Sequence, residues 1–458
     1  MTGPDPLPTP AEGDVCVIGG GLAGIAAALR LADAGARVTL LESRPELGGA
    51  TYSFQRDDLT VDTGQHVFLR CYSAYRELLA RLGTDGDTDV QKRFSVPVLL
   101  PGRSAHLLTR SRLPAPAHLL PALSRYRLLD RGERLAAIRA AAALRHVDPD
   151  RRATDEESFG DWLTAHGQRP RAIRRLWDLI TVAALNVPAD RASLALAARV
   201  FRTGLLGSAD AGDIGRPLVP LTDLHAIPAR RVLAGLRVRV RTHARVGWIR
   251  QEEQGFRLGI NGSELTTQAV VLAVPHPAAA RLVPASAAPD AGRWSLLGAA
   301  PIVNVHLRYA APVTELRFAA AVESPAQWIF DRSTPEMGGE QHLVVSLSAA
   351  DAELARSTAD LVAAQRAALA ELFPAARATA VRDAFVTREP RATFRQGPGT
   401  RAYRPQAATR MPGLALAGAW TDTGWPDTME GAVRSGTDAA DVVCRHLASR
   451  PRHTEAAR

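Results

Sequence analysis

One segment, residues 14–42, constrains the fold of this chain more than any other. It begins with a short apolar run, Val15–Ile18, which is typical of a buried parallel strand. The Ala- and Leu-rich stretch that follows predicts a helix ending near Gly35. A second apolar run, Val38–Leu41, predicts another strand. The segment therefore predicts one βαβ unit.

The turn between the first strand and the helix carries glycines at G-x-G-x-x-G spacing. Gly19, Gly21 and Gly24 permit a tight turn, close approach of a pyrophosphate to the backbone, and close packing of helix on strand. Phosphates would bind at the helix N-terminus, where the first N–H groups lack partners. Glu42 lies 18 residues after Gly24, near the usual ~20 for an acid that binds a ribose hydroxyl. We therefore expect a dinucleotide-binding unit.

Composition limits the possible functions. The 458 residues are 46% hydrophobic, enough for two or three cores, and the formal net charge is +9. Such a charge raises nucleic acid or an anionic membrane as partners. Lys92 is the only lysine, so arginine carries nearly all the positive charge, and aromatic residues make up only 5%. The arginines do not interleave with aromatic residues, so we expect no nucleic-acid partner.

Cysteine usage and hydropathy indicate the compartment. The three cysteines are scattered, with no C-x-x-C pair and no plausible disulfide framework, which suits a reducing cytoplasm. Residues 1–13 are Pro-rich and lack a signal-peptide pattern. No apolar run reaches the ~18–20 residues needed to span a bilayer. We expect a cytoplasmic protein without a metal site, at most peripheral at the inner face of the plasma membrane.

Residues 43–228 change from α/β patterning to helical patterning. Gly48-Gly49 would keep side chains out of the space beside a cofactor. Residues 61–68 predict a short strand or turn, and residues 96–102 end a strand pair. Helices are expected over 71–83, over 106–147 with proline interruptions, from 158, over 171–185 and over 193–205, with loops at 85–87 and 213–217.

The 106–147 segment is rich in arginine, with Asp130 and Glu133 as the opposing charges. A basic amphipathic segment can lie on an anionic membrane surface. A solvated helix face explains the same pattern equally well.

From residue 237 the hydrophobic period becomes two, which predicts antiparallel strands. The apolar run 269–275 suits the centre of a sheet, and residues 298–386 predict a second sheet with a helix over 352–372. An apolar strand at 414–418 leads through a glycine-bearing loop into the last helix. That helix gives a second free N-terminus, as expected if a long cofactor places its phosphates at one helix and a ring system at the other. The first set of strands is expected over 237–242, 246–249 and 256–260, with a turn near 253–255.

Three segments together resemble the flavin-containing amine oxidase and carotenoid desaturase superfamily. They are the glycine-rich turn with Glu42, the Leu47–Gly49 segment, and residues 418–436. Within this superfamily, the chain most resembles the hydroxysqualene dehydroxylase family over nearly its whole length. The signatures at Gly64–His66 and Trp420–Pro426 are the most specific. The other matching pieces are Asp62-Thr63, Arg391–Phe394, Arg404-Pro405 and Glu430–Gly436.

The resemblance implies an α/β fold: a Rossmann-like FAD-binding domain with a discontinuous α+β substrate domain, made of a mixed sheet plus a helical subdomain. The implied segments are 1–95, 229–290 and 396–446 for the FAD-binding domain, 96–228 for a helical substrate or membrane-facing subdomain, 291–395 for the substrate-domain sheet and helix, and 447–458 for a flexible tail.

The resemblance also implies non-covalent FAD, with the glycine turn at the pyrophosphate, Glu42 at the ribose and the last helix at the flavin ring. Two departures remove contacts. The family commonly has Arg where this chain has Ala50, and Asp where it has Ala419. One lost charged hydrogen bond costs about 1.5–3 kcal/mol, at most about a hundredfold in affinity. The implied cofactor-binding residues are Gly19, Gly21, Leu22, Ala23, Gly24, Glu42, Ser43, Arg44, Gly48, Gly49, Ala50, Gly64, Gln65, Val246, Ala273, Gly418, Ala419, Met429, Glu430, Gly431, Ala432 and Val433.

The implied reaction replaces the hydroxyl group of hydroxysqualene by hydrogen, giving squalene for hopanoid biosynthesis. The hydroxyl must leave as water, which requires a proton donor, and reduced flavin can supply a hydride. Candidate donors are His66, which titrates near neutral pH, and Asp422 or Asp427, if burial raises the pKa. Structural roles stay open, because His66 can also orient Gln65 and Asp422 can cap the last helix.

Partners follow from the same resemblance. A hydrophobic isoprenoid substrate suits an apolar tunnel in the Leu-rich region 106–228, opening at a membrane, and a hydroxysqualene-forming enzyme is a further partner. NADPH or another electron donor must reduce the flavin, but no second G-x-G-x-x-G marks its site. The alternatives are a carotenoid (phytoene-type) desaturase, an amine oxidase, which the low Tyr count of 6 disfavours, and a non-catalytic isoprenoid-lipid carrier.

Overall fold

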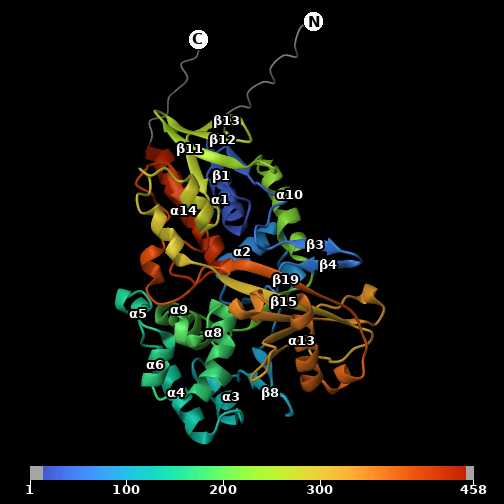
Figure 1. Ribbon diagram of the computed structural model, residues 1–458. Coiled ribbons are helices and arrows are strands. Elements are labelled where there is room, and N and C mark those ends of the chain that lie inside the picture. The colour runs from blue at the N-terminus through green and yellow to red at the C-terminus, as the bar shows by residue number, and fades with distance from the viewer. Residues whose placement is uncertain (1–13, 450–458) are drawn as a thin grey trace, which may run out of the picture.

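A five-stranded parallel sheet contains the predicted βαβ unit. The computed structural model describes residues 14–449 (Figure 1). The sheet order is β10-β2-β1-β14-β20, and every neighbouring pair is parallel. The three central strands are fully buried, as their apolar runs predict. The strands are β1 (Val15–Ile18), β2 (Val38–Leu41), β10 (Arg239–Arg241), β14 (Ala269–Leu272) and β20 (Leu414–Leu416).

The two ends of the described chain meet on this sheet. Helix α1 (Leu22–Asp33) follows β1, and helix α14 (Met429–Ser449) packs along it. A Cβ at Gly436 would overlap the carbonyl oxygen of Ala23, so only glycine permits this close approach. Arg30 and Asp441 form an ion pair of 2.9 Å across the same contact. The predicted tail begins inside α14, and residues 1–13 and 450–458, with the signal-peptide expectation and the rest of the tail, lie outside the described residues.

Two predictions for residues 237–260 have different outcomes. The antiparallel ribbon is confirmed, because β11 (Val246–Glu252) and β12 (Gly255–Ile260) pair with Glu252 opposite Gly255. A third strand, β13 (Ser263–Thr267), extends the ribbon. The prediction that residues 237–242 belong to it is wrong, because β10 lies parallel to β2 at an edge of the five-stranded sheet. An edge strand with one exposed face shows the same alternating pattern.

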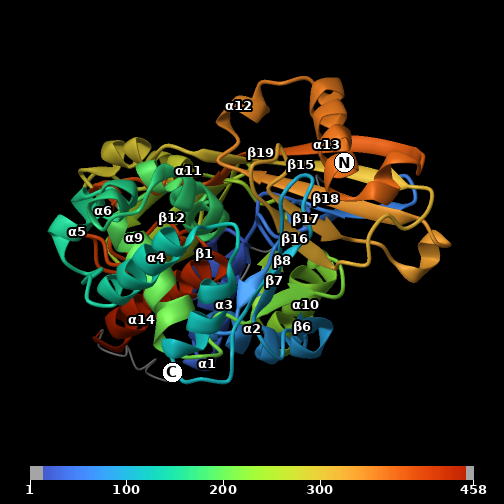
Figure 2. The same ribbon diagram turned by 90° about the horizontal axis from the view of Figure 1, so that it is seen from below.

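A seven-stranded mixed sheet forms the second layer, in the order β19-β15-β18-β17-β16-β7-β8. Helix α13 (Thr358–Leu372) lies on its outer face (Figure 2). The single helix predicted over 352–372 is interrupted, because α12 (Asp351–Leu354) stops early and Ser357 caps α13. The strands are β7 (Ser95–Leu99), β8 (His106–Thr109), β15 (Ala300–Tyr309), β16 (Phe318–Ala321), β17 (Trp328–Asp331), β18 (Gln341–Ser348) and β19 (Val381–Thr393).

Helices between residues 117 and 207 gather at the end of the molecule opposite the termini (Figure 1). The helices expected from 158 and 193 are confirmed, and Ser158 and Ser193 cap them. The helix expected over 171–185 is confirmed as α7, a π-helical stretch and α8. The helices are α3 (Leu120–Arg125), α4 (Arg131–Leu144), α5 (Arg152–Glu156), α6 (Phe159–Ala165), α7 (Pro170–Ala172), α8 (Asp178–Leu185) and α9 (Leu194–Phe201), with π-helical stretches at Ile173–Trp177 and Arg202–Gly207.

Two local predictions here are wrong, and a third segment, predicted as a loop, contains one regular turn. Residues 106–109 are not helical but form β8, which pairs with β7. Residues 214–217 are not a loop but form β9, which bridges β5 and β6. Residues 85–87 form a 3₁₀ turn. The remaining elements are β3 (Ser53–Arg56), β4 (Leu59–Asp62), β5 (Phe68–Leu69), α2 (Ser73–Leu82), β6 (Thr88–Val90), α10 (Ile227–Gly235) and α11 (His276–Leu282).

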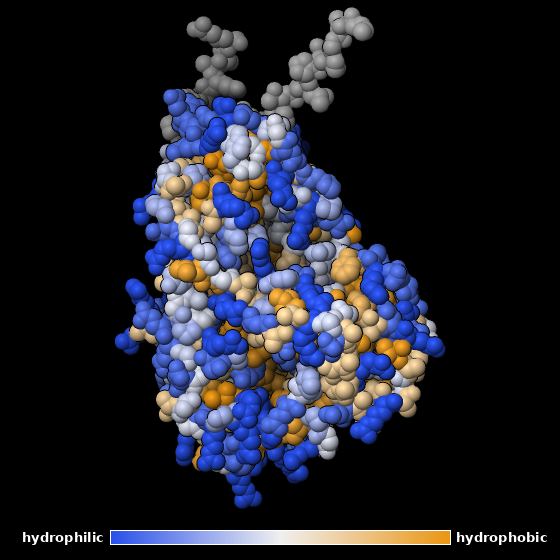
Figure 3. Space-filling model, viewed as in Figure 1, coloured by the Kyte–Doolittle hydropathy of each residue, from blue (hydrophilic) through white to orange (hydrophobic). Residues whose placement is uncertain are grey.

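The face of the molecule seen in Figure 3 is mostly hydrophilic, with apolar residues in recesses and small patches. Across residues 14–449, each helix is either too short or too polar to pass through a bilayer.

Candidate functional site

Two glycine segments lie against each other at the carboxyl end of β1. The Gly48 N–H donates to the Gly20 carbonyl oxygen at 2.8 Å, and Gly21 forms a parallel bridge to Gly48. A Cβ at Gly49 would lie 2.8 Å from the Gly21 Cα, too close for any side chain. The two predicted segments therefore form one cradle of backbone.

Glu42 ends β2 beside this cradle. Its Oε2 accepts from the Gly20 N–H at 2.7 Å, and its Oε1 accepts from the Arg44 N–H at 2.8 Å and from the Ser43 hydroxyl. The Ala244 N–H donates to the Glu42 carbonyl oxygen at 2.8 Å, which brings the start of β11 at Val246 to the same place. A carboxylate has about four acceptor sites, so Glu42 can still accept from a ribose hydroxyl.

The carboxyl ends of β14 and β20 bring later parts of the chain to the same edge of the sheet. The Ala273 N–H donates to the Ile18 carbonyl oxygen at 2.8 Å, and the Gly418 N–H donates to the Ser435 hydroxyl at 2.8 Å. The Thr63 hydroxyl donates to the Ala50 carbonyl oxygen at 2.7 Å, which ties the segment before Gly64, Gln65 and His66 to the cradle. In open parallel sheets, ligands bind at this edge.

The residues at this edge fit a dinucleotide such as FAD. The cradle exposes backbone where side chains would collide, and the N-cap of α1 is a glycine with no side chain to satisfy the first N–H groups. The first turn of α1 carries no acid that would repel a pyrophosphate.

Arg404 holds the loop that joins β20 to α14. Its buried guanidinium donates to four carbonyl oxygens, those of Ala419 at 3.1 Å, Trp420 at 3.3 Å, Thr421 at 2.6 Å and Trp425 at 2.7 Å. Burial lowers the pKa of this arginine from its usual value. One side chain therefore sets the path of the whole loop.

Asp427 lies just before α14 and is the strongest candidate acid. Its Oδ2 accepts from the Phe394 N–H at 2.8 Å, and its own N–H donates to Oε1 of Gln396 at 2.9 Å. Burial raises the pKa of Asp427 to about 6, although the Phe394 N–H and Arg404 oppose the rise. The carboxyl group can therefore hold a proton near neutral pH.

The other two predicted proton donors are in different situations. Asp422 accepts from Nε of Arg401 at 3.0 Å and from Nε2 of Gln406 at 3.1 Å, so it is a member of an ion pair. His66 lies with Nδ1 3.0 Å from the Gly64 carbonyl oxygen. Burial lowers the pKa of His66, because desolvation disfavours the charged form of the ring.

The first turn of α14 brings Met429 to Val433 to the sheet edge, but Glu430 turns away. Its buried carboxylate accepts from the N–H groups of Ala74 at 3.2 Å and Tyr75 at 2.8 Å, and from Nε of Arg434 at 2.7 Å. It therefore satisfies the start of α2. Glu430 can reach a cofactor only through its backbone.

Sequence reasoning missed Glu389, on the inner face of the seven-stranded sheet. Burial raises the pKa of this half-buried carboxyl, and the nearby Arg44 opposes the rise. Glu389 shares its face with Thr387 and Phe385, which lie opposite Asn304 and His306 in the register. The only sign of Glu389 in the sequence was the alternation of side chains between the two faces of β19. Charged residues along this strand obscure its apolar pattern.

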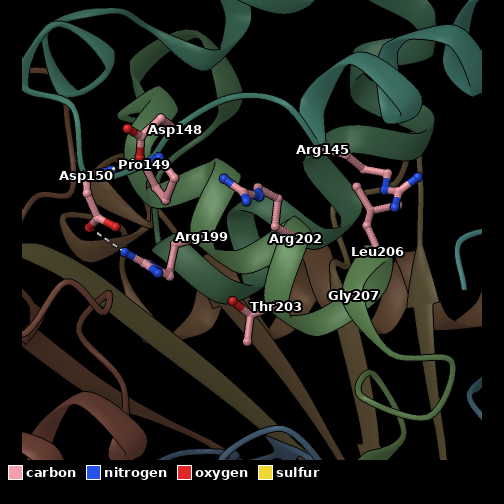
Figure 4. Close-up of a pocket in the computed structure, with 9 residues that line it drawn as sticks. All are labelled: Arg145, Asp148, Pro149, Asp150, Arg199, Arg202, Thr203, Leu206 and Gly207. Carbon is pink, nitrogen blue, oxygen red and sulfur yellow. Dashed lines mark hydrogen bonds and ion pairs between the residues drawn. The ribbon is translucent and has the colours of Figure 1, made fainter.

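A separate polar cavity of about 390 Å³ lies between the end of α4 and α9 (Figure 4). Arg199 on its wall pairs with Asp150 at 2.6 Å, and its Nε donates to the Gly424 carbonyl oxygen at 3.0 Å. This arginine joins the helical region to the loop that Arg404 holds. The lining residues are Arg145, Asp148, Pro149, Asp150, Arg199, Arg202, Thr203, Leu206 and Gly207.

Known proteins resemble the chain over nearly its whole length. The hydroxysqualene dehydroxylase of Rhodopseudomonas palustris is 32% identical, covering 94% of this chain and 98% of the relative. The zeta-carotene desaturase of Zea mays is 26% identical, covering 94% of this chain and 83% of the relative. Among solved structures, cyclohexylamine oxidase from Brevibacterium oxydans superposes with a TM-score of 0.70 at 19% identity, covering 96% and 100% of the two chains.

The superposition on cyclohexylamine oxidase shows the fold, which is an α/β flavoprotein fold with a second, mixed sheet. This confirms the fold class expected from the sequence. The family model for flavin-containing amine oxidoreductases matches residues 22–444. The match includes the Gly48-Gly49 side of the cradle, Glu42, Arg404 and the start of α14, and it begins directly after Gly21. The chain therefore belongs to the flavin-containing amine oxidoreductase family and is a flavin-dependent oxidoreductase.

Proposed function

We propose that the protein replaces the hydroxyl group of hydroxysqualene with hydrogen, giving squalene, as a step of hopanoid biosynthesis. The observation that carries this proposal is the match with the Rhodopseudomonas palustris hydroxysqualene dehydroxylase, at 32% identity over 98% of that protein. The family implies FAD as the cofactor.

The glycine cradle would hold the pyrophosphate of FAD, Glu42 its ribose, and the first turn of α14 its ring. When bound and reduced, FAD supplies a hydride, and NADPH or another electron donor restores the reduced form. A C30 hydrocarbon needs a site lined by apolar side chains, and leucines and aromatic residues predominate in the core of the helical region.

Asp427 supplies the proton that the reaction needs. Its protonated carboxyl donates to the substrate hydroxyl, the C–O bond breaks, and the hydroxyl departs as water. The allylic cation that remains on the substrate would accept the hydride. Proton and hydride together replace hydroxyl by hydrogen, so the step balances. An acid with a pKa of about 6 suits this task, because it can both hold and release a proton near neutral pH. Phe394 and Gln396 orient it.

A carotenoid desaturase is the second candidate, because zeta-carotene desaturases match the chain at similar coverage. A desaturase removes hydride from its substrate and has no hydroxyl to expel. Electrons therefore pass from the flavin to the substrate in the dehydroxylation, and from the substrate to the flavin in the desaturation.

Purified, FAD-loaded protein should be supplied separately with hydroxysqualene plus NADPH or dithionite, with zeta-carotene or phytoene plus a quinone, and with putrescine plus oxygen. We expect squalene from the first mixture and no product from the others. Desaturated carotenoid without squalene would replace the proposal with the second candidate. FAD-loaded protein that forms no product with any mixture would favour a lipid carrier.

A further inference from the structure

Exposed leucines are concentrated at the end of the molecule formed by β8, α3 and α4. Nine large hydrophobic side chains are exposed among the described residues, and four of them lie between residues 107 and 135. Their exposed fractions run from 41% to 60%. The four are Leu107, Leu113, Leu120 and Leu135.

These leucines belong to adjoining elements. Helix α3 packs against β8 and α4. The His106 and Tyr126 rings meet edge to face at 6.2 Å, and Arg134, next to Leu135, donates to the Ser124 carbonyl oxygen. Figure 1 places α3, α4 and β8 at the lower end of the molecule, away from the five-stranded sheet.

The same end is strongly basic. Residues 103–145 contain nine arginines and two acids, and Arg171 pairs with both acids, Asp130 at 2.8 Å and Glu133 at 2.7 Å. In Figure 3 this end is mostly hydrophilic, with separate apolar residues between. Its seven exposed arginines are Arg103, Arg112, Arg125, Arg127, Arg131, Arg139 and Arg145.

We infer that this end, the leucine–arginine surface, docks on an anionic lipid bilayer. Arginine excess complements anionic headgroups, and exposed leucines enter the boundary between headgroups and acyl chains. A polyanion such as nucleic acid would use the arginines but gain nothing from the leucines. The inference stands on these side chains alone and does not rest on the proposed reaction.

The test is co-sedimentation of the flavin-loaded protein, without substrate, with phosphatidylcholine vesicles that contain either no phosphatidylglycerol or about a third of it. We expect binding to the anionic vesicles, weakened by salt because exposed charges are screened. Replacing three arginines by glutamine should weaken binding about a hundredfold, at about fivefold for each basic residue. The variant is Arg112→Gln/Arg125→Gln/Arg127→Gln.

A leucine variant separates lipid from other anions. Leu107→Ser/Leu113→Ser/Leu120→Ser should also weaken vesicle binding at least tenfold, because the leucines would no longer enter the bilayer. The matched control is Leu218→Ser/Leu296→Ser, which removes leucines that are 54% and 58% exposed outside this surface. The charge control is Arg239→Gln/Arg281→Gln/Arg410→Gln.

The controls should bind vesicles as the unchanged protein does, and all variants should keep the flavin spectrum and melting temperature. Absence of binding to anionic vesicles would overturn the inference. Equal losses in the controls would also overturn it. Loss in the arginine variant without loss in the leucine variant would assign the surface to a polyanion instead.

Discussion

At the scale of single residues, the proposed chemistry depends on the half-buried carboxyl of Asp427. Asp427→Asn keeps an oxygen to accept from the Phe394 N–H but has no acidic proton. We expect squalene formation to fall at least a hundredfold, the usual contribution of a positioned acid. Flavin binding, measured by absorbance, should be unchanged. Activity within threefold of the unchanged protein would assign the proton to another group, and Glu389→Gln is the variant to examine next.

The raised pKa of Asp427 also predicts a pH dependence. The folded-state pKa of about 6 exceeds the value of about 4 for an unfolded chain, so the folded protein binds this proton more tightly. Ionising this carboxyl therefore costs stability progressively as pH rises from about 4 to 6. Relative to the unchanged protein, Asp427→Asn should gain about 2 kcal/mol of unfolding free energy between pH 4 and pH 7.5. Denaturant unfolding at the two pH values measures this, and an equal difference at both would contradict it.

Arg404 positions the loop before α14 through the N–H groups of its planar guanidinium. Lysine cannot reach four carbonyl oxygens at once, so Arg404→Lys leaves several of them buried without a partner. We expect a loss of about 2–4 kcal/mol in unfolding free energy and weaker FAD binding by titration. Arg410→Lys, on the exposed surface, is the control and should change neither.

At the scale of elements, the contact between α1 and α14 brings the two ends of the chain together. Gly436→Ala places a methyl group against the backbone of Ala23, which cannot move aside easily. Overpacking of this kind costs about 1–3 kcal/mol. The control Gly235→Ala, at the end of α10 with open space around it, should be neutral or slightly stabilising. Similar melting temperatures for both variants would contradict the close packing.

Sequence patterns predicted the elements whose periodicity is local. The βαβ unit, the central strand β14 and α14 all have a strong apolar signal or a glycine turn of their own. The hydrophobic pattern failed for strands whose position depends on which other strands they pair with. β10 has the alternation of a ribbon strand but pairs with β2, and the short strand β9 exists because β5 and β6 lie on either side of it.

In the candidate site, too, some residues could be predicted from the sequence and others could not. Motif spacing predicted the cradle and Glu42, because backbone geometry alone dictates those residue types. It could not decide between His66, Asp422 and Asp427, because the burial and the hydrogen-bond partners of these side chains depend on the fold. Residue type likewise could not show that the Glu430 side chain faces α2.

At the scale of the whole molecule, FAD would join residues that are about 400 positions apart in the chain. A ligand that binds only the folded state raises stability by about 2.7 kcal/mol at a hundred times its dissociation constant. We expect FAD to raise the melting temperature measured by calorimetry, and Glu42→Gln to reduce that increase. An increase that Glu42→Gln leaves unchanged would place the ribose elsewhere.

The direction of electron flow between flavin and substrate distinguishes dehydroxylation from desaturation. Protein loaded with FAD is reduced without oxygen, freed of excess reductant, and mixed with hydroxysqualene while flavin absorbance and squalene are followed together. The account predicts one squalene formed for each flavin reoxidised, with both processes slowed in Asp427→Asn. A flavin that stays reduced with hydroxysqualene, while the oxidised form is reduced by zeta-carotene, would contradict it.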